Sequence, residues 1–419
     1  MRQLIILGNG FDINCELKSK YEDFFLSRFS ELLNHQYSIL EDLKSPLNKK
    51  TMEIISDIWD ETNPRDYFSL YSKKWFGDTD AELNRWDIIF MFAKLCIDEE
   101  VSQCNWEDVE SIIYEVVSIA LNDGVGKNSK IKYKEKVENG NGQSDGKEAF
   151  YKLVRSISFV KADKLTKSVI AAELLSELKK FEAIFSRYIS DQIDLDHPKE
   201  GYVKKAIDLY KAISKYSNRS KTNSIDTVDV LSFNYSLDEK FQDIIDREID
   251  DYRLKSWSNI HGIAHYKETP YYPAPIFGID NHNISANGEE MDYRIPFTKL
   301  YRVLEGHIND IRGSKSYKNT DLISIFGHSL GEADYSYFES IFDENELYRS
   351  NCKIEYYYWP GNSGDEGSKL IQRQRNATNL YNLLINYGET LDKKYGKNIV
   401  TKLNIENRIS LIPTSEITK

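Results

Sequence analysis

The chain has 419 residues, and its 55 Lys and Arg against 67 Asp and Glu leave a formal net charge of −12. This length is typical of two or three domains with a sizeable core, whereas the acidic balance argues against a broad nucleic-acid-binding surface. The four cysteines lie far apart without a CxxC pair, which argues against a zinc ribbon and a disulfide framework. No apolar run reaches the length of a signal-peptide core or a membrane span, so we expect a cytoplasmic protein without membrane contact.

Helical patterns dominate the first half of the chain. An apolar strand pattern covers Arg2–Leu7, and no proline, the strongest interrupter of helices, then occurs between residues 65 and 197. Apolar residues recur at helical spacing over 109–120 and 174–188. Residues 123–148 lie between these patterns and are polar and glycine-rich, which indicates a flexible excursion. We therefore predict a mostly helical insertion over residues 31–214 with a flexible segment near 123–148.

Beyond residue 215 the pattern changes to short apolar runs, several of which lead into an amphipathic helix. The predicted strands are 227–233, 256–260, 275–277, 321–326 and 353–359. After the first of them, Ser236 and Glu239 have the spacing of a helix capping box. Strands that alternate with helices are typical of βαβ units and a parallel sheet. We therefore predict a discontinuous α/β domain with a Rossmann-like parallel sheet, formed by residues 1–30 and 215–419.

A glycine-containing turn follows the first predicted strand. In GNGFD, which is Gly8–Asp12, two glycines permit a sharp turn and a close approach of the backbone to a phosphate. Their free N–H groups could also receive an anion. The full G-x-G-x-x-G fingerprint is missing, because Ile13 stands at the third glycine position. A tight turn without a ligand is therefore an equally good interpretation.

Polar side chains follow the next two predicted strands. Asn234, in FNYS, is either a helix cap or a ligand-binding residue. His261, in IHG, is either a buried structural histidine or a functional one beside Gly262. The spacing of His261 and His265 would suit a metal only on a helix, and no third ligand lies nearby, so we expect no metal.

The segment FGHSLGEAD follows a later predicted strand. Its Gly327, Ser329 and Gly331 suit a contact with an anion or a ribose, and the alternative is an ordinary strand-to-helix turn with Asp334 as the N-cap. In open α/β sheets, ligands bind outside the carboxyl ends of the strands. Four polar segments at predicted strand ends therefore indicate one shared site.

Seven segments of the chain resemble, in this order, the bacterial AbiH abortive-infection family. They are LIILGNGFDIN, SKYEDFF, NWEDVE, LSFNYS, IHG, IFGID and FGHSLGEAD, and together they extend over essentially the whole chain. The resemblance implies a role in phage defence, in which the infected cell is stopped or killed before the virus matures.

AbiH proteins are in turn remotely similar to the sirtuin-type NAD-binding fold. By that resemblance Gly8–Gly10 match the glycine loop, Asn234 the asparagine motif, His261 the histidine, and Gly327–Ser329 the later turn. The chain departs from the pattern because no aspartate directly follows Asn234-Tyr235 and the zinc ribbon of sirtuin deacylases is missing. The resemblance therefore implies hydrolysis of NAD rather than deacylation. The residues that it assigns to NAD binding are Gly8, Asn9, Gly10, Phe11, Gly262, Gly327, His328, Ser329 and Asp334.

Cleavage of the nicotinamide N-glycosidic bond passes through an oxocarbenium-like state and needs a positioned water. We expect Asn234 to hold the ribose or that water and His261 to act as general base, since histidine titrates near neutral pH. Asp12 would orient the ribose or stabilise positive charge, and an Asx turn is an equal alternative for it. In NWEDVE we expect a structural or site-capping role for Trp106 and Glu110.

Two other classes of function remain open. One is a nuclease-type effector. The net charge of −12 argues against it, and the sequence has neither an R-x4-H pattern nor carboxylates at metal-site spacing. The other is a non-catalytic nucleotide-sensing module that acts through a partner, which the split architecture would also suit. We expect NAD or a related nucleotide as the ligand and an inactive resting form, with a phage-derived trigger and self-association as further candidates.

Overall fold

The structure of this chain is a computed structural model, which describes residues 1–35, 37–59, 66–77, 82–98, 108–121, 131–139, 142–158, 166–216, 225–249, 251–264, 275–279, 284, 292–306, 316–331, 334–361, 366–392 and 396–417. The chain divides into two compact units. Unit 1 comprises Met1–Ser19, Ser186–Pro273 and Gly306–Lys419. Unit 2 comprises Lys20–Phe185 and Ala274–Glu305. The sequence patterns place the insertion at residues 31–214 and assign 274–305 to the α/β domain instead.

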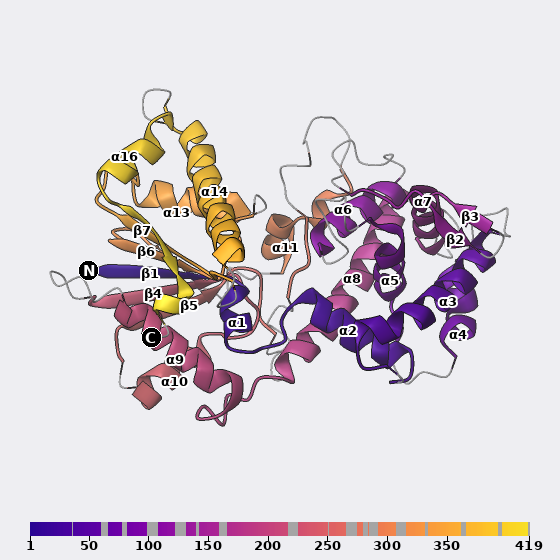
Figure 1. The fold of residues 1–419 in the computed structure, drawn as a ribbon. Coiled ribbons are helices and arrows are strands. Elements are labelled where there is room, and N and C mark those ends of the chain that lie inside the picture. Colours follow the sequence, from indigo (N-terminus) through magenta and orange to yellow (C-terminus); the bar gives the residue numbers. More distant parts are fainter. Residues whose placement is uncertain are drawn as a thin grey trace. The chain divides into compact units, whose positions relative to one another are not determined.

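Unit 1 is built on a six-stranded sheet whose neighbouring strands pair in parallel. The strand order is β5-β4-β1-β6-β7-β8 (Figure 1). The strands are β1 (Arg2–Leu7), β4 (Thr227–Ser232), β5 (Leu254–Asn259), β6 (Leu322–Phe326), β7 (Lys353–Tyr358) and β8 (Ile409–Pro413). This arrangement confirms the predicted Rossmann-like α/β fold.

Helices cover both faces of this sheet, with α13, α14 and α16 on one face and α9 and α10 on the other (Figure 1). The helices of unit 1 are α1 (Gly10–Asn14), α9 (Gly201–Tyr216), α10 (Lys240–Ile249), α13 (Tyr335–Glu344), α14 (Glu366–Thr390) and α16 (Ile399–Ile405). Strands that are covered on both faces consist almost entirely of apolar residues. Nearly every residue of β1, β4 and β6 is buried, although β4 departs from this rule in also burying Asp229 and Ser232.

One predicted strand is wrong, and one strand of the sheet was not predicted. Pro275–Phe277 forms no strand, because its apolar run is only three residues long and begins with a proline. Phe277 instead packs its ring against Phe185 and Tyr21 in unit 2, with ring centroids 5.0 and 5.4 Å apart. The strand pattern also misses β8, an edge strand that ends in Pro413 and has only Ile412 buried.

Unit 2 is mostly helical, and the predicted helical stretches at 109–120 and 174–188 lie within α6 and α8. Its helices are α2 (Tyr21–Leu32), α3 (Leu40–Trp59), α4 (Tyr67–Phe76), α5 (Arg85–Cys96), α6 (Val109–Ala120), α7 (Gly146–Ile157), α11 (Lys299–Glu305) and α8 (Lys167–Ser190), whose last residues belong to unit 1. Phenylalanine rings from several of these helices pack together in its core, among them Phe24, Phe90 and Phe181. Within the described part of the chain, no helix has both the length and the apolar character that a membrane crossing requires.

Part of the glycine-rich stretch at 123–148 lies within the described residues. Its described residues, 131–139 and 142–148, include the antiparallel strands β2 (Val137–Asn139) and β3 (Gly142–Ser144) and the start of α7. Asp145 caps α7, since its Oδ1 accepts hydrogen bonds from the backbone N–H groups of Lys147 and Glu148. The flexible excursion stays a prediction, and the other residues of this stretch lie outside the described residues.

A buried ion pair and a partly exposed one link the segment 275–305 to other elements of unit 2. The Arg302 guanidinium donates to both carboxylate oxygens of Glu182, at 3.0 and 2.6 Å, and the Phe277 backbone N–H donates to Glu182 at 2.8 Å. The Lys299 ammonium lies 2.6 Å from a Glu110 carboxylate oxygen. The side chains of Arg302 and Glu182 are almost completely buried. Because Glu182 is on α8, this ion pair links the segment 275–305 to that helix.

Candidate functional site

The polar segments that the sequence singles out meet at the carboxyl ends of four neighbouring strands in unit 1. The parallel register pairs Leu7 with both Ser232 and Phe326, and it pairs Ser232 with Asn259. The residues that follow β1, β4, β5 and β6 therefore begin at the same edge of the sheet. This is the edge at which ligands of open α/β sheets bind.

The glycine turn after β1 packs backbone to backbone against the turn after β6. A Cβ atom on Gly8 would lie 2.5 Å from the Cα of His328, and one on Gly10 would lie 2.6 Å from the Cα of Gly327. Gly327 itself has a φ of +68°, in the left-handed region that favours glycine. The close packing of the two turns is therefore by itself a sufficient reason for glycine at these positions, whether or not a ligand binds there.

The backbone N–H groups of the first turn are already used within the protein. Those of Gly8 and Gly10 donate to the carbonyl oxygens of Phe326 and Gly327, at 2.9 and 2.8 Å. The N–H of Phe11 donates to the carbonyl oxygen of Gly8 at 2.9 Å. The expectation that the glycine N–H groups are free to receive an anion is therefore wrong in this arrangement.

Asp12 lies at the centre of a buried hydrogen-bonded cluster. Its Oδ1 atom accepts hydrogen bonds from the Tyr202 hydroxyl at 2.6 Å and from the Ser236 hydroxyl at 2.8 Å. Only 2% of Asp12 is exposed, and this burial raises its pKa from 3.8 to about 6. Hydrogen bonds from Tyr202, Ser236 and Asn234 act in the opposite direction on that pKa. The Asx-turn alternative does not describe this carboxylate, which is held by side chains from other elements.

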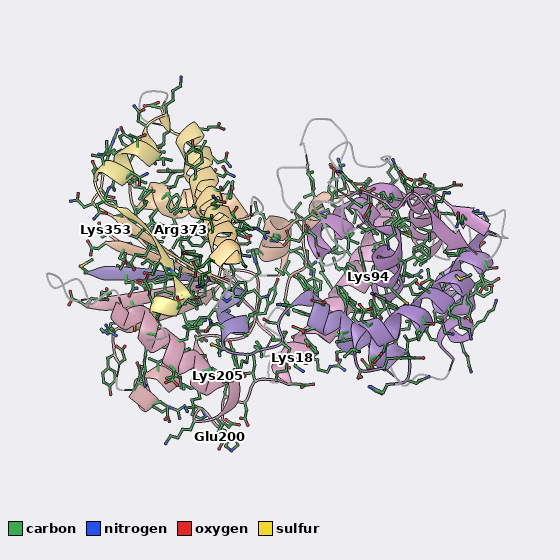
Figure 2. The ribbon with its side chains drawn as sticks, viewed as in Figure 1. Lys18, Lys94, Glu200, Lys205, Lys353 and Arg373 are labelled. Atoms are coloured by element: carbon green, nitrogen blue, oxygen red, sulfur yellow. The ribbon has the colours of Figure 1, made fainter. Side chains whose placement is uncertain are left out.

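Helix α9 supplies Tyr202, and it also forms an ion pair at the protein surface with a residue near the start of the chain. Lys205, on the same helix and labelled in Figure 2, forms an ion pair with Glu16, which lies just beyond α1. Burial raises the pKa of the Tyr202 hydroxyl well above 10, so it stays protonated and donates to Asp12.

Asn234 joins the tips of β4 and β1. Its side-chain Nδ2 donates to the Gly8 carbonyl oxygen at 3.0 Å, and its backbone N–H donates to the Ser232 hydroxyl at 3.1 Å. Asn234 caps no helix, because α10 begins only at Lys240. The predicted capping box is also wrong, since the Ser236 hydroxyl is bound to Asp12.

The two histidines that the sequence singles out, His261 and His328, both contact the ring of Phe233. The ring of Phe233 is 5.6 Å from that of His261 and 4.4 Å from that of His328, and both contacts are edge-to-face. Both histidines are buried. Gly262, beside His261, has a φ of +91°, which a larger residue would adopt only with strain. His265 lies outside the described residues.

His328 has a defined tautomer. Its Nδ1 accepts a hydrogen bond from the Leu330 backbone N–H at 3.0 Å, so the proton of the neutral ring is on Nε2. That nitrogen lies 3.5 Å from a carboxylate oxygen of Asp334, which begins α13 without a side-chain cap hydrogen bond. Asn9 and Ser329 are exposed beside these buried groups.

Four residues that the sequence patterns do not single out help to build the site: Tyr202, Asn259, Tyr356 and Asn379. Asn259 donates to the Asn234 carbonyl oxygen at 2.9 Å. Tyr356 donates to the His328 carbonyl oxygen at 2.9 Å, and Asn379 donates to that of Ser329 at 3.0 Å. Of these four residues, only Asn259 has a sequence feature that could have indicated a role in the site, namely its position at the end of a predicted strand. Tyr202, Tyr356 and Asn379 have no such feature.

The NWEDVE segment has a structural role where it is described. Asp108 caps α6 by accepting a hydrogen bond from the Ser111 backbone N–H at 3.1 Å, and Glu110 pairs with Lys299. Trp106 lies outside the described residues. In the described part of the chain, no three His, Cys, Asp or Glu side chains are grouped so that they could hold a metal ion.

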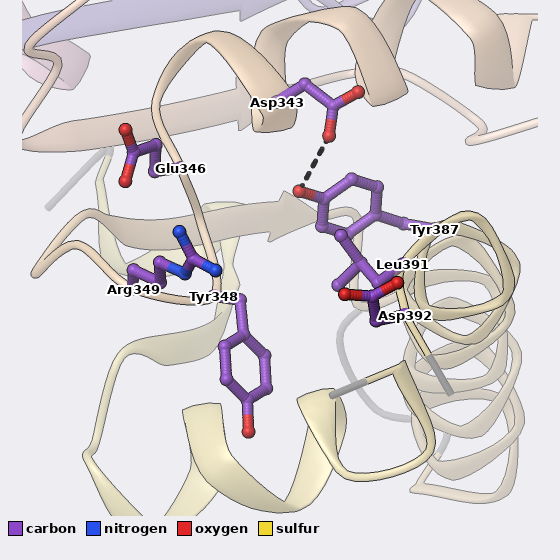
Figure 3. A pocket seen from close by; sticks show the side chains of 7 residues that line it. All are labelled: Asp343, Glu346, Tyr348, Arg349, Tyr387, Leu391 and Asp392. Carbon is purple, nitrogen blue, oxygen red and sulfur yellow. Dashed lines mark hydrogen bonds between the residues drawn. The ribbon is translucent and has the colours of Figure 1, made fainter. Parts of the chain in front are cut away.

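A pocket of about 200 Å³ lies elsewhere in unit 1, lined by Asp343, Glu346, Tyr348, Arg349, Tyr387, Leu391 and Asp392 (Figure 3). It lies where α13 and α14 end, which in a parallel α/β unit is the edge of the sheet opposite to the strand tips. The Tyr387 hydroxyl donates to Asp343 at 3.0 Å across it. None of the predicted site residues lines this pocket.

Comparisons with known proteins support one family. No curated protein and no solved structure matches this chain. The family model for bacteriophage abortive infection AbiH, in contrast, matches residues 4–358. The match includes β1, β4, β5, β6 and β7 with all the strand-tip segments described above. The chain therefore belongs to the AbiH family of bacteriophage abortive-infection proteins.

Proposed function

We propose that this protein carries out its abortive-infection role by binding NAD at the strand-tip site and cleaving the bond between nicotinamide and ribose. Membership of the AbiH family indicates the anti-phage role. The observation that supports an enzymatic site is the buried cluster of Asp12, Tyr202, Ser236 and Asn234 at the carboxyl ends of the strands. Titratable groups with a pKa shifted toward neutrality are concentrated at catalytic sites.

The proposed reaction uses one water molecule and no redox step. The water oxygen forms a bond to C1′ of the ribose, and the bond from C1′ to the nicotinamide nitrogen breaks with its electron pair moving into the pyridinium ring. The water loses a proton to a general base, so neutral nicotinamide and ADP-ribose leave. Asp12, with a pKa of about 6, is largely ionised at neutral pH and suits the role of base. Asn234 would orient the ribose, and His261 is the second candidate base.

The burial of the cluster supports an inactive resting form. Asp12, Asn234 and His261 are exposed by only 2%, 5% and 3%. A dinucleotide reaches such groups only after neighbouring segments move, and closing segments of this kind often control enzyme turnover. We therefore propose that infection supplies the change that opens the site, through a phage-derived trigger or self-association.

The test measures NAD, RNA and DNA in cells that express the protein during phage infection, and nicotinamide release by the purified protein. Asn234→Ala should abolish both the fall in NAD and the defence. Asn345→Ala is the matched control, because Asn345 is equally buried but binds the Thr320 N–H before β6 begins. Its defence and NAD loss should match those of the native protein.

Other outcomes separate the competing functions. Degradation of RNA or DNA at constant NAD would support the nuclease-type effector instead. Defence without loss of NAD, RNA or DNA would favour a non-catalytic nucleotide-sensing module that acts through a partner. Full defence by a folded Asn234→Ala variant would exclude the proposed role of this site.

A further inference from the structure

Two hydroxyl groups from different parts of unit 1 converge on a single oxygen of Asp12. Tyr202 comes from the first turn of α9, and Ser236 comes from the loop between β4 and α10. Both donate to Oδ1, and the two hydroxyl oxygens are 3.0 Å apart. All three residues are at least nine-tenths buried. The carboxylate is therefore fixed in one orientation by residues far away in the sequence.

These hydroxyls also favour the charged form of the carboxylate. Neither loses its proton in this environment, because serine is not acidic and burial raises the Tyr202 pKa further. A donor to a carboxylate stabilises the ionised form and opposes the effect of burial. Without these two donors, burial would raise the pKa of Asp12 further, and a protonated acid cannot accept a proton from water.

The other ionisable groups around Asp12 cannot replace the two hydroxyls. Cys15 lies on the same side of α1, and burial raises its pKa, so it is a neutral thiol. Lys205 and Glu16 pair with each other at the surface, and Asp208 lies on α9 near them. Charges at the surface are screened by water and salt, whereas the hydroxyls are in direct contact with the carboxylate.

We propose that Tyr202 and Ser236 are positioning residues that hold Asp12 ionised and correctly oriented for catalysis. The proposal rests on the hydrolase function proposed above, in which Asp12 is the base. It assigns no contact between either hydroxyl and the substrate. Their removal should therefore act on the protonation and orientation of Asp12, and on turnover more than on substrate binding.

The first test follows Asp12 without any reaction. In protein labelled with aspartate carrying ¹³C at the carboxyl carbon, the Asp12 resonance is the one missing from Asp12→Asn, and its shift is followed against pH. Tyr202→Phe and Ser236→Ala should each raise the midpoint by about one pH unit, since each removes one hydrogen bond to the charged group. Tyr210→Phe is the matched control: Tyr210 is buried on the same helix, and its hydroxyl has no hydrogen-bond partner among the described residues.

The second test follows the reaction. With Tyr202→Phe and Ser236→Ala, the acid limb of the kcat/KM profile against pH should move upward together with the resonance midpoint. We expect kcat to fall about ten-fold or more at neutral pH while KM changes little. Tyr210→Phe should leave the profile in place.

The outcomes are distinguishable. If the Asp12 midpoint stays unchanged in both hydroxyl variants, or if it moves while the kcat/KM profile does not, the positioning role is overturned and the hydrolase function is untouched. If the native protein cleaves no NAD under any condition, the hydrolase function fails and the catalytic part of the positioning role fails with it. The resonance midpoints then decide alone whether the hydroxyls set the charge of Asp12.

Discussion

Replacement of Asp12 by asparagine should stabilise the folded protein at neutral pH and, at the same time, remove the proposed catalytic base. The side chain of asparagine has nearly the same shape as that of aspartate, and its oxygen can still accept the hydroxyls of Tyr202 and Ser236. It has no charge to desolvate. The native carboxylate is 2% exposed, and its ionised form is the less stable one inside the protein.

The magnitude follows from the pKa of Asp12 in the two states. Well below pH 3.8 the carboxyl is protonated in both the folded and the unfolded protein and does not affect stability. Between the ordinary value of 3.8 and the folded value of about 6, the unfolded protein loses the proton first, so stability falls as the pH rises. At higher pH the full loss is about 3 kcal/mol, at about 1.4 kcal/mol per pKa unit. The variant lacks this loss.

The assay is the unfolding of both proteins in urea between about pH 4 and about pH 7, with hydrogen exchange of the β1 and β4 peptides as the probe of unit 1. The free energy of unfolding of Asp12→Asn minus that of the native protein should rise by about 2.4 kcal/mol over this range. Asp243→Asn, the same change at an exposed position of α10, measures the effect of removing one charge from unit 1. A difference between Asp12→Asn and native protein that is flat or falls as pH rises would refute the reasoning.

Three further predictions concern separate parts of the chain. Asn234→Ala and His261→Ala should each lower nicotinamide release by about 10²-fold or more with little change in the thermal midpoint, and a large drop in that midpoint would assign them a structural role instead. Gly327→Ala should prevent a stable unit 1, because the new Cβ would lie 2.4 Å from a backbone nitrogen at a φ of +68°; soluble protein with a native thermal midpoint would contradict this. Arg302→Ala should destabilise unit 2 by about 3–5 kcal/mol because it leaves the buried Glu182 carboxylate without its guanidinium partner, and the Arg302→Met, Glu182→Leu double variant should recover most of that loss in urea unfolding.

The sheet was predictable from the sequence because its central strands carry the information locally. β1, β4 and β6 are covered on both faces, so each carries a short run rich in apolar residues, followed within two residues by glycine or asparagine. β8 lies at the edge, alternates between exposed and partly buried residues, and ends in proline, so no local pattern marks it. At Pro275–Phe277 the error is the reverse: an apolar run is present but no strand forms. A short apolar run can equally be a loop that packs into a helical unit.

The candidate site was predictable only in part, and for a related reason. Gly8, Asn234, His261 and Gly327 stand at strand ends, and parallel pairing brings strand ends together whatever lies between them. The partners of Asp12 come instead from tertiary packing. Tyr202 is 190 residues away from Asp12 and has no neighbouring motif. Ser236 even carries a misleading local signal, because capping-box spacing fits it as well as the contact with Asp12 does.

The central position of β1 has a consequence for synthesis on the ribosome. β1 pairs with β4 and β6. The central strands can therefore pair only after the ribosome has made the partners of β1, namely Thr227 opposite Arg2 and Leu322 opposite Gln3. At about 5–20 residues per second, translation from Arg2 to Thr227 takes roughly 10–45 s. During that time an apolar strand is exposed in the nascent chain and becomes a candidate for chaperone binding. Asp12 receives the hydroxyls of Tyr202 and Ser236 only when this delay is over, so partly made chains cannot contain the assembled cluster.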